Sequence, residues 1–216
     1  MNLRDDQLTT CLDLGEFESW LALESVLELQ KSVPVEINWL PLVAGLKRFS
    51  NKDELKDTDD EFQRYKQKRL SARNRYMQTN RIRYAALLGL KENDIDRQYD
   101  STLVSICMLW VRDRFPTKLV NYMRRVFESH YRGYKDLTLE SSLIDILNDL
   151  DAVEDDLVEY LHSDGAALMV VVQDELAEAG LFAAPAFWLR GERFQGREHL
   201  PLISWYLSGQ KGSPPV

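Results

Sequence analysis

Cysteine is scarce in this sequence, and the two cysteines present are not arranged as a redox or metal site. Cys11 and Cys107 stand far apart among the 216 residues and form no Cys-x-x-Cys motif. This usage is typical of a reduced cytoplasmic protein without a disulfide framework, and a Cys11–Cys107 bridge is the alternative that the sequence leaves open. The three histidines show no metal-ligand spacing either, so we expect no metal site.

Long apolar runs and an excess of positive charge are also missing. No run approaches the roughly 20 apolar residues that span a bilayer. Residues 1–6 are polar and lack the apolar centre of a signal peptide. The formal net charge of −8 disfavours nonspecific nucleic-acid binding as the main activity. We therefore expect a cytoplasmic protein with neither a membrane nor a nucleic acid among its partners.

The chain is rich in apolar residues: 44% are hydrophobic, enough for one sizeable core or for one domain with a large insertion. Near the N-terminus, residues 7–14 read as a short strand, 19–31 as a largely buried helix and 35–40 as a second, alternating strand. Ser19 is a suitable N-cap, because its hydroxyl can accept a hydrogen bond from a first-turn N–H. Together these segments predict a βαβ unit.

The rest of the chain is first helical and then mixed. From about residue 53 to 163 we find only helical patterns, the clearest of which repeats apolar residues at i, i+3, i+4 and i+7. The expected helices there cover 60–90, 102–110, 143–150 and 153–161. After them we expect a helix over 164–179 ended by Gly180, strands over 185–189 and 193–195 joined by a tight turn at 190–192, and a helix over 196–207.

This order, βαβ followed by a helical block and αββα, is that of a thioredoxin-like α/β fold with a large all-helical insertion. Pro185 begins the third strand, where a residue without an N–H fits. Locally a trans proline is the ordinary interpretation, whereas the thioredoxin fold has a cis proline at this place. We expect a thioredoxin-like domain over 1–52 and 164–208, a helical insertion domain over 53–163, and a flexible tail over 209–216.

The C-terminal stretch AGLFAAPAFWLRGERFQGREHLPLISWYL resembles the signature of the DsbA-like thioredoxin proteins, in particular the 2-hydroxychromene-2-carboxylate isomerases and the kappa-class glutathione transferases. It keeps the family's Gly180, Phe182, Pro185, Phe187, Gly191, Glu192, Phe194, Gly196 and Leu200. The stretches LDLGEFESWLALESVLEL and VEINWLPLVAG resemble the family's first strand, first helix and second strand, and NRIRYAALLGL resembles a helix of its insertion. The resemblance implies glutathione as a ligand, no covalently bound cofactor, and a homodimer.

The chain departs from this family where the family's chemistry lies. Redox members carry Cys-x-x-Cys before the first helix, and the isomerase and kappa branch carries Ser-Pro-Tyr-Ser; Glu16-Phe17-Glu18-Ser19 stand here instead. Without a cysteine in this window, dithiol–disulfide exchange through it is chemically excluded. An ionised Glu16 would repel a glutathione thiolate by about 4 kcal/mol at about 4 Å, which outweighs the roughly 0.3–1 kcal/mol that a helix dipole offers.

The candidate catalytic residues are therefore Glu16 and Ser19, and each has two interpretations. Glu16 is either a general base at the helix N-terminus or, with Glu18, an acidic residue that binds free first-turn N–H groups. Ser19 is either part of the chemistry or a helix cap. The candidate ligand-binding residues are Phe17, Trp20, Arg81, Arg83, Ala184 and Pro185.

Charge is divided unevenly along the chain. Between Phe62 and Leu90 there are eight basic residues and no acidic one, and between Asp136 and Leu189 there is no Lys or Arg. The basic run is either a wall that binds an anionic ligand or one of two complementary helical faces, docked on each other or solvated.

Three functions remain open at this point. The first is an isomerase- or transferase-like protein that binds glutathione or another small anion between the Glu16 helix and the Ala184–Pro185 loop. The second is a non-catalytic thioredoxin-fold module whose cleft binds a peptide or partner. The third is an enzyme that uses Glu16 as acid or base without glutathione.

Overall fold

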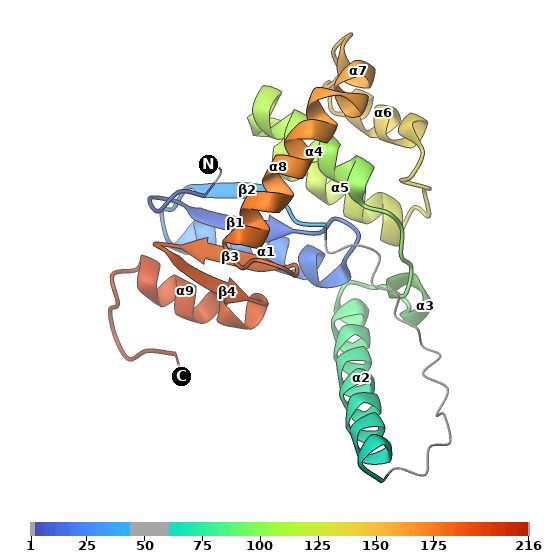
Figure 1. Cartoon of the computed structure of the whole chain (residues 1–216). Coiled ribbons are helices and arrows are strands. Elements are labelled where there is room, and N and C mark those ends of the chain that lie inside the picture. The colour runs from blue at the N-terminus through green and yellow to red at the C-terminus, as the bar shows by residue number, and fades with distance from the viewer. Residues whose placement is uncertain (1–2, 44–60, 216) are drawn as a thin grey trace. The chain divides into compact units, whose positions relative to one another are not determined.

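A four-stranded mixed sheet forms the centre of the fold, in a computed structural model that describes residues 3–43 and 61–215. Its strands are β1 (Leu8–Leu12), β2 (Ile37–Pro41), β3 (Ala186–Leu189) and β4 (Glu192–Gln195). Their order is β2-β1-β3-β4, with β1 parallel to β2 and antiparallel to β3, and β3 antiparallel to β4 (Figure 1). All five residues of β1 are buried, as a central strand covered on both faces requires.

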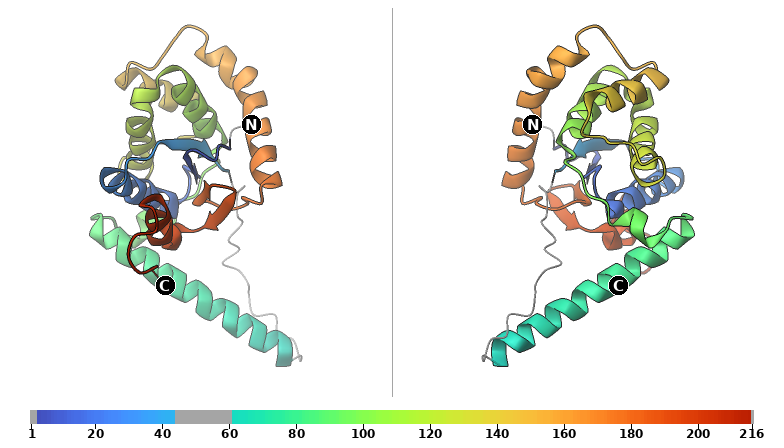
Figure 2. Two further views of the ribbon diagram at one scale, coloured as in Figure 1. Left: turned by 90° about the vertical axis from the view of Figure 1, so that its left-hand side faces the viewer. Right: turned by 90° about the vertical axis from the view of Figure 1, so that its right-hand side faces the viewer.

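Helices cover both faces of this sheet. The helix α1 (Phe17–Ser32) follows β1 on one face, and α8 (Asp164–Glu178) crosses the opposite face (Figures 1 and 2). The short 3-10 turn η2 (Arg197–His199) and the closing helix α9 (Leu200–Leu207) pack against α1. The predicted βαβ…αββα order is thus confirmed, and with it the thioredoxin-like fold class.

The insertion between β2 and α8 is helical throughout the part that the structure describes. It contains α2 (Glu61–Leu87), α3 (Glu92–Ile95), α4 (Thr102–Arg114), the 3-10 turn η1 (Pro116–Lys118), α5 (Leu119–Tyr131), α6 (Glu140–Asp149) and α7 (Leu157–His162). The sequence analysis located no separate helix at α5, although its buried residues recur at the spacing of one helix face: Leu119, Tyr122, Met123, Val126 and Phe127.

The chain divides into two compact units, and the second unit ends well before the end of the expected insertion. One unit comprises Met1–Gly45 and Gln98–Val216, and the other comprises Leu46–Arg97. Helix α4 explains the difference, because it packs directly against β2 and α8 and so joins the core around the sheet. Residues 98–163 of the expected insertion domain therefore belong to the same compact unit as the thioredoxin-like elements.

Two turns have the backbone that their sequence predicts. In the β3–β4 hairpin, Arg190 and Gly191 have φ values of +51° and +83°, the left-handed pair that a two-residue turn needs. Gly180 follows α8 with φ +75°, as a helix-ending C′ glycine does. None of the helices in the described ranges is both long enough and apolar enough to cross a membrane.

Candidate ligand site at the start of α1

The candidate site lies at one end of the sheet, where two segments that are far apart in the sequence meet. Strand β1 runs toward this end and leads through residues 13–16 into α1. Strand β3 begins at the same end, since the antiparallel register pairs Ala186 with Cys11. The loop that contains Ala184 and Pro185 is therefore next to the segment that starts α1. The Ala184–Pro185 peptide bond is cis.

The end of β4 holds the proline loop in place. The Pro185 carbonyl oxygen accepts hydrogen bonds from the Gly196 N–H at 2.9 Å and from the Gln195 side-chain amide at 3.3 Å. The same amide nitrogen donates to the Ala183 carbonyl oxygen. Pro185 itself is buried, whereas Ala184 is half-buried. Of the two predicted loop residues, Ala184 is thus the one with surface available to a ligand.

Glu16 is the N-cap residue of α1. Its backbone is extended, with φ −107° and ψ 127°, and its carbonyl oxygen accepts the N–H groups of Ser19 at 3.0 Å and Trp20 at 3.4 Å. Its half-buried side chain makes no capping hydrogen bond to the helix. The interpretation of Glu16 as a side chain that binds first-turn N–H groups is therefore wrong.

Ser19 is not the N-cap that the sequence analysis expected. The helix begins two residues earlier, at Phe17, and Ser19 lies inside its first turn, fully buried. Its hydroxyl oxygen accepts the backbone N–H of Asp13 at 3.0 Å, which fastens the loop before the helix onto the helix itself. The capping motif failed as a guide because this serine bonds backward to the loop and not to a first-turn N–H.

Buried polar groups from the helical insertion fix the same loop. The Asp13 carboxylate accepts hydrogen bonds from the Ser101 hydroxyl at 2.6 Å and from the Gly15 N–H at 2.9 Å. The hydroxyls of Tyr99 and Tyr131 donate to the carbonyl oxygens of Leu14 at 2.9 Å and of Gly15 at 3.1 Å, respectively. Burial, with Tyr131 and Asp13 nearby, raises the pKa of Tyr99 well above its ordinary value, so its phenol remains a donor. The loop is consequently held from two sides.

Two further predicted ligand residues belong to the core. Phe17 is fully buried, and Trp20 is 4% exposed. Trp20 stacks on Phe127 and on Tyr131 with ring centroids 5.8 and 5.6 Å apart, and Phe17 meets Tyr131 edge-on at 5.7 Å. These rings pack against the first turn of α1 inside the core and present almost no exposed surface to a ligand.

An ion pair that the sequence analysis missed crosses this region. Arg197 of η2 lies 3.4 Å from a carboxylate oxygen of Glu18 in the first turn of α1. Both side chains are partly exposed, 22% for Arg197 and 32% for Glu18. One hint of this ion pair is present in the sequence, because Arg197 directly follows Gly196 of the family-like C-terminal motif.

The predicted residues Arg81 and Arg83 lie on α2, in the second compact unit. Arg81 donates from its guanidinium to the carbonyl oxygen of Ile95 at 2.7 Å, and Arg83 donates to the side-chain oxygen of Asn80 at 3.1 Å. Both contacts are made within their own unit. Arg81 thereby connects α2 to α3, a structural role that the family-like NRIRYAALLGL stretch did not indicate.

Neither cysteine can serve as a thiolate in the folded chain. Cys11 and Cys107 are both free and buried, and burial raises the pKa of each thiol to about 12. In the part of the chain that the structure describes, no group of three or more His, Cys, Asp or Glu side chains could hold a metal ion.

Comparison with known proteins finds likeness in structure and not in sequence. No protein-family model matches the chain, and no curated protein matches it. A 2-hydroxychromene-2-carboxylate isomerase superposes with a TM-score of 0.67 at 14% identity, covering 94% of this chain and 95% of that one. A probable DsbA oxidoreductase from Streptomyces coelicolor gives 0.65 at 13% identity, with coverages of 97% and 93%.

The cytosolic disulfide reductase DsbM from Pseudomonas aeruginosa is similar as well. It superposes with a TM-score of 0.57 at 12% identity, covering 95% of this chain and 97% of that one, and its structure with glutathione gives 0.56 at 13% identity. These superpositions establish the fold, and they agree with the resemblance inferred from the C-terminal motif. The chain therefore has the DsbA-like thioredoxin fold and is similar over nearly its whole length to 2-hydroxychromene-2-carboxylate isomerase.

Proposed function

We propose that this protein binds glutathione or another small anionic ligand between the start of α1 and the Ala184–Pro185 loop, and that it does not exchange dithiols there. The observation that carries the proposal is the meeting of these two segments at one end of the sheet, with Ala186 paired to Cys11. A neighbour with the same fold, DsbM, has been solved with glutathione.

The chemistry of this region suits an anion. The first N–H groups of a helix lack partners within the helix and carry about half a positive charge, so they favour a carboxylate or thiolate. Arg197 adds a full positive charge beside the first turn, shared with Glu18 at 3.4 Å. The half-buried Ala184 offers backbone polar groups that can pair with the backbone of a peptide-like ligand.

Redox chemistry by a thiol pair is absent from the proposal for two reasons. The tetrapeptide Glu16-Phe17-Glu18-Ser19 contains no sulfur. Cys11, in the strand that leads toward the site, is buried with a pKa of about 12, and disulfide exchange requires a thiolate. Within this proposal Glu16 either keeps a bound thiol protonated or acts as the base of an isomerase-like proton transfer.

A second candidate function is a peptide-binding module without catalysis. Phe182, three residues before the cis proline, is 74% exposed. A large apolar side chain beside available backbone groups is the combination that an extended peptide uses, with main-chain pairing for affinity and a side-chain contact for specificity.

Thermal unfolding with glutathione, and with its sulfur-free analogue ophthalmic acid, tests the proposal. At about 100 times the dissociation constant either ligand should stabilise the fold by about 2.7 kcal/mol, a shift of several degrees. Arg197→Gln should weaken both, whereas Arg190→Gln, the same loss of a positive charge at the exposed β3–β4 turn, should weaken neither. Glu16→Ser should favour glutathione over ophthalmic acid, because removing the carboxylate lets the bound thiol ionise.

Each result has a defined meaning. A shift with both compounds supports recognition through the peptide part of the ligand. A shift of the unaltered protein with glutathione alone would show that the thiol is recognised despite Glu16, and the electrostatic argument would be wrong. No shift with either compound would exclude the glutathione site and leave the peptide module as the better candidate.

We also propose a cytoplasmic location and a homodimer. The location is supported by the two free cysteines and by the cytosolic DsbM neighbour. The homodimer is supported by the family resemblance alone.

A further inference from the structure

The loop that precedes β3 has no side chain that could hold its own backbone. Residues 183–185 are Ala-Ala-Pro, so their side chains neither donate nor accept hydrogen bonds, and Pro185 also lacks a backbone N–H. Ala183 is half-buried and Pro185 is buried, and a carbonyl group away from water needs a donor. The donors for this loop must therefore come from another segment of the chain.

Gln195, the last residue of β4, provides two of these hydrogen bonds. Its side-chain nitrogen donates to the carbonyl oxygen of Ala183 and, at 3.3 Å, to that of Pro185. A side-chain amide has two hydrogens on one nitrogen, so it can bind both oxygens at once. The Gly196 N–H adds a third bond, to the Pro185 oxygen at 2.9 Å. The carbonyl groups on both sides of Ala184 are thus held by the end of β4.

The backbone of Ala184 itself is open. Among the residues that the structure describes, neither its N–H nor its carbonyl oxygen has a hydrogen-bond partner. The peptide bond between Ala183 and Ala184 is trans, so the Ala183 carbonyl and the Ala184 N–H lie in one plane and point in opposite directions. Because Gln195 binds the Ala183 oxygen, it directs the Ala184 N–H away from β4.

We propose that Gln195 is a positioning residue of the ligand site, which aims the Ala184 N–H at an acceptor oxygen of the ligand. This inference rests on the proposed function, in which Ala184 pairs with the backbone of a peptide-like ligand. Gln195 does not touch the ligand in this proposal. It lowers the cost of binding, because a loop that already has the bound conformation loses less freedom when the ligand arrives.

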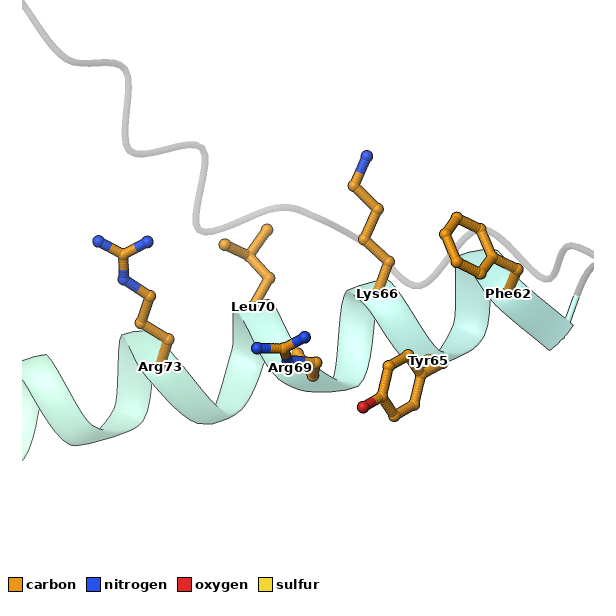
Figure 3. Close-up of a pocket in the computed structure, with 6 residues that line it drawn as sticks. All are labelled: Phe62, Tyr65, Lys66, Arg69, Leu70 and Arg73. Carbon is orange, nitrogen blue, oxygen red and sulfur yellow. The ribbon is translucent and has the colours of Figure 1, made fainter.

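The pocket on α2 is another place where an anionic ligand could bind, and the experiment must separate the two. Three apolar and three basic side chains line this pocket, and the basic ones are exposed: Phe62, Tyr65, Lys66, Arg69, Leu70 and Arg73 (Figure 3). Ligand bound there would be sensitive to the charges of α2 and insensitive to Gln195.

Gln195→Met tests the proposal, because it keeps a similar volume and removes the amide. The matched control is Gln173→Met in α8. The half-buried Gln173 amide donates to the Pro41 carbonyl oxygen and accepts the Val43 N–H, both at 2.9 Å, so it also holds a strand end, but at β2, two strands from β3. A third variant, Lys66→Gln with Arg69→Gln and Arg73→Gln, removes the charges of the α2 pocket.

Three measurements are made on each variant. Calorimetric titration gives the affinity for glutathione and for ophthalmic acid, and denaturant unfolding gives the global stability. Hydrogen exchange of the Gly196 N–H, followed by NMR, reports how often the loop opens, because this N–H is bound to the Pro185 oxygen. If Gln195→Met does not fold, Gln195→Asn replaces it, since the shorter amide cannot reach both carbonyl oxygens.

We expect Gln195→Met to weaken both ligands roughly tenfold, which is about 1.4 kcal/mol at 25 °C, and to speed the exchange of Gly196 by a similar factor. Gln173→Met should lower the global stability by a similar amount and change neither the affinity nor the exchange at Gly196. A role of Gln195 in stability alone would not separate these two variants. The α2 variant should bind both ligands as the unaltered chain does.

Four results would overturn the proposal: an unchanged affinity of Gln195→Met, unchanged exchange at Gly196, an equal loss of affinity in Gln173→Met, or loss of binding in the α2 variant. If the unaltered chain binds neither compound, the proposed function fails. Faster exchange at Gly196 in Gln195→Met would then still support the loop part of this proposal, and unchanged exchange would overturn that part too.

Discussion

At the scale of single residues, the proposed ligand site lacks the sulfur that a redox thioredoxin site requires, because residues 16–19 are Glu-Phe-Glu-Ser. Glu16 caps the backbone of α1 through its carbonyl oxygen, and Glu18 pairs with Arg197 at 3.4 Å. Neither side chain contains sulfur, so a ligand at these residues cannot form a mixed disulfide with them.

The two thiols of the folded protein should be unreactive. Both have a pKa of about 12, so at pH 8 only about one thiol in 10,000 is ionised, and burial blocks the reagent as well. We expect no release of colour from Ellman's reagent by the native chain at pH 8 and two equivalents after guanidinium is added. Reaction of one thiol in the native state would show that a cysteine is accessible, and it would contradict the burial on which the non-redox assignment depends.

Individual residues also show which features of this site the sequence could predict and which it could not. Glu16 and the Ala184–Pro185 loop were located from the position of motifs alone. Ser19 was misassigned, because its partner is the N–H of Asp13 and not a first-turn N–H. Tyr99 and Tyr131 reach the loop from 85 and 116 residues away, and no local pattern in a single sequence encodes contacts at such separations.

At the scale of helices and strands, the prediction succeeded where one physical pattern dominated. The two strands after Pro185 were predicted because a proline at the strand start, a turn at Gly191 and flanking apolar residues all indicate a β-hairpin. The boundaries of the insertion helices were less certain, since α5 and α7 follow α4 and α6 after short connections. Packing between these helices depends on small residues, and Gly165 in the first turn of α8 is the clearest case.

Replacing Gly165 by alanine should destabilise the protein, although helix propensity alone predicts a gain of about 1 kcal/mol. A Cβ atom at this position would lie 2.7 Å from Cγ2 of Ile106 and would overlap the ring of Tyr160. That ring packs on Trp110 with centroids 5.0 Å apart, so it has little room to move. We expect a net loss of about 1–3 kcal/mol, measured by denaturant unfolding.

The control for this prediction is Ala167→Gly on the exposed side of α8, where propensity acts without crowding. It should cost about 1 kcal/mol. Stabilisation by Gly165→Ala would mean that α4, α7 and α8 are packed less closely than the structure indicates.

At the scale of the whole molecule, the division into compact units separates the thioredoxin-like core from helices α2 and α3. The unit of Met1–Gly45 and Gln98–Val216 contains the sheet, the helices on both its faces and all the contacts of the 13–16 loop described above. The unit of Leu46–Arg97 contains α2 and α3. The sequence analysis predicted a single insertion over 53–163, because helical periodicity is the same on both sides of residue 97. Only the packing of α4 against β2 and α8 distinguishes α4 from α2.

This division predicts that the chain folds without its second unit. We expect a variant in which residues 46–97 are replaced by a flexible Gly/Ser linker of about 12 residues to unfold cooperatively, within several degrees of the full chain. The reason is the small amount of burial removed: among the described side chains of 61–97, only Ala85, Asp94 and Ile95 are buried. At about 25 cal/mol per Å², burial of one aliphatic side chain contributes about 2–3 kcal/mol, which a domain of this size can lose.

Circular dichroism and calorimetry would measure the transition. The shortened chain should keep the Ala184–Pro185 ligand site. Loss of a cooperative transition would show that the second unit is part of the core and would contradict the division into two compact units.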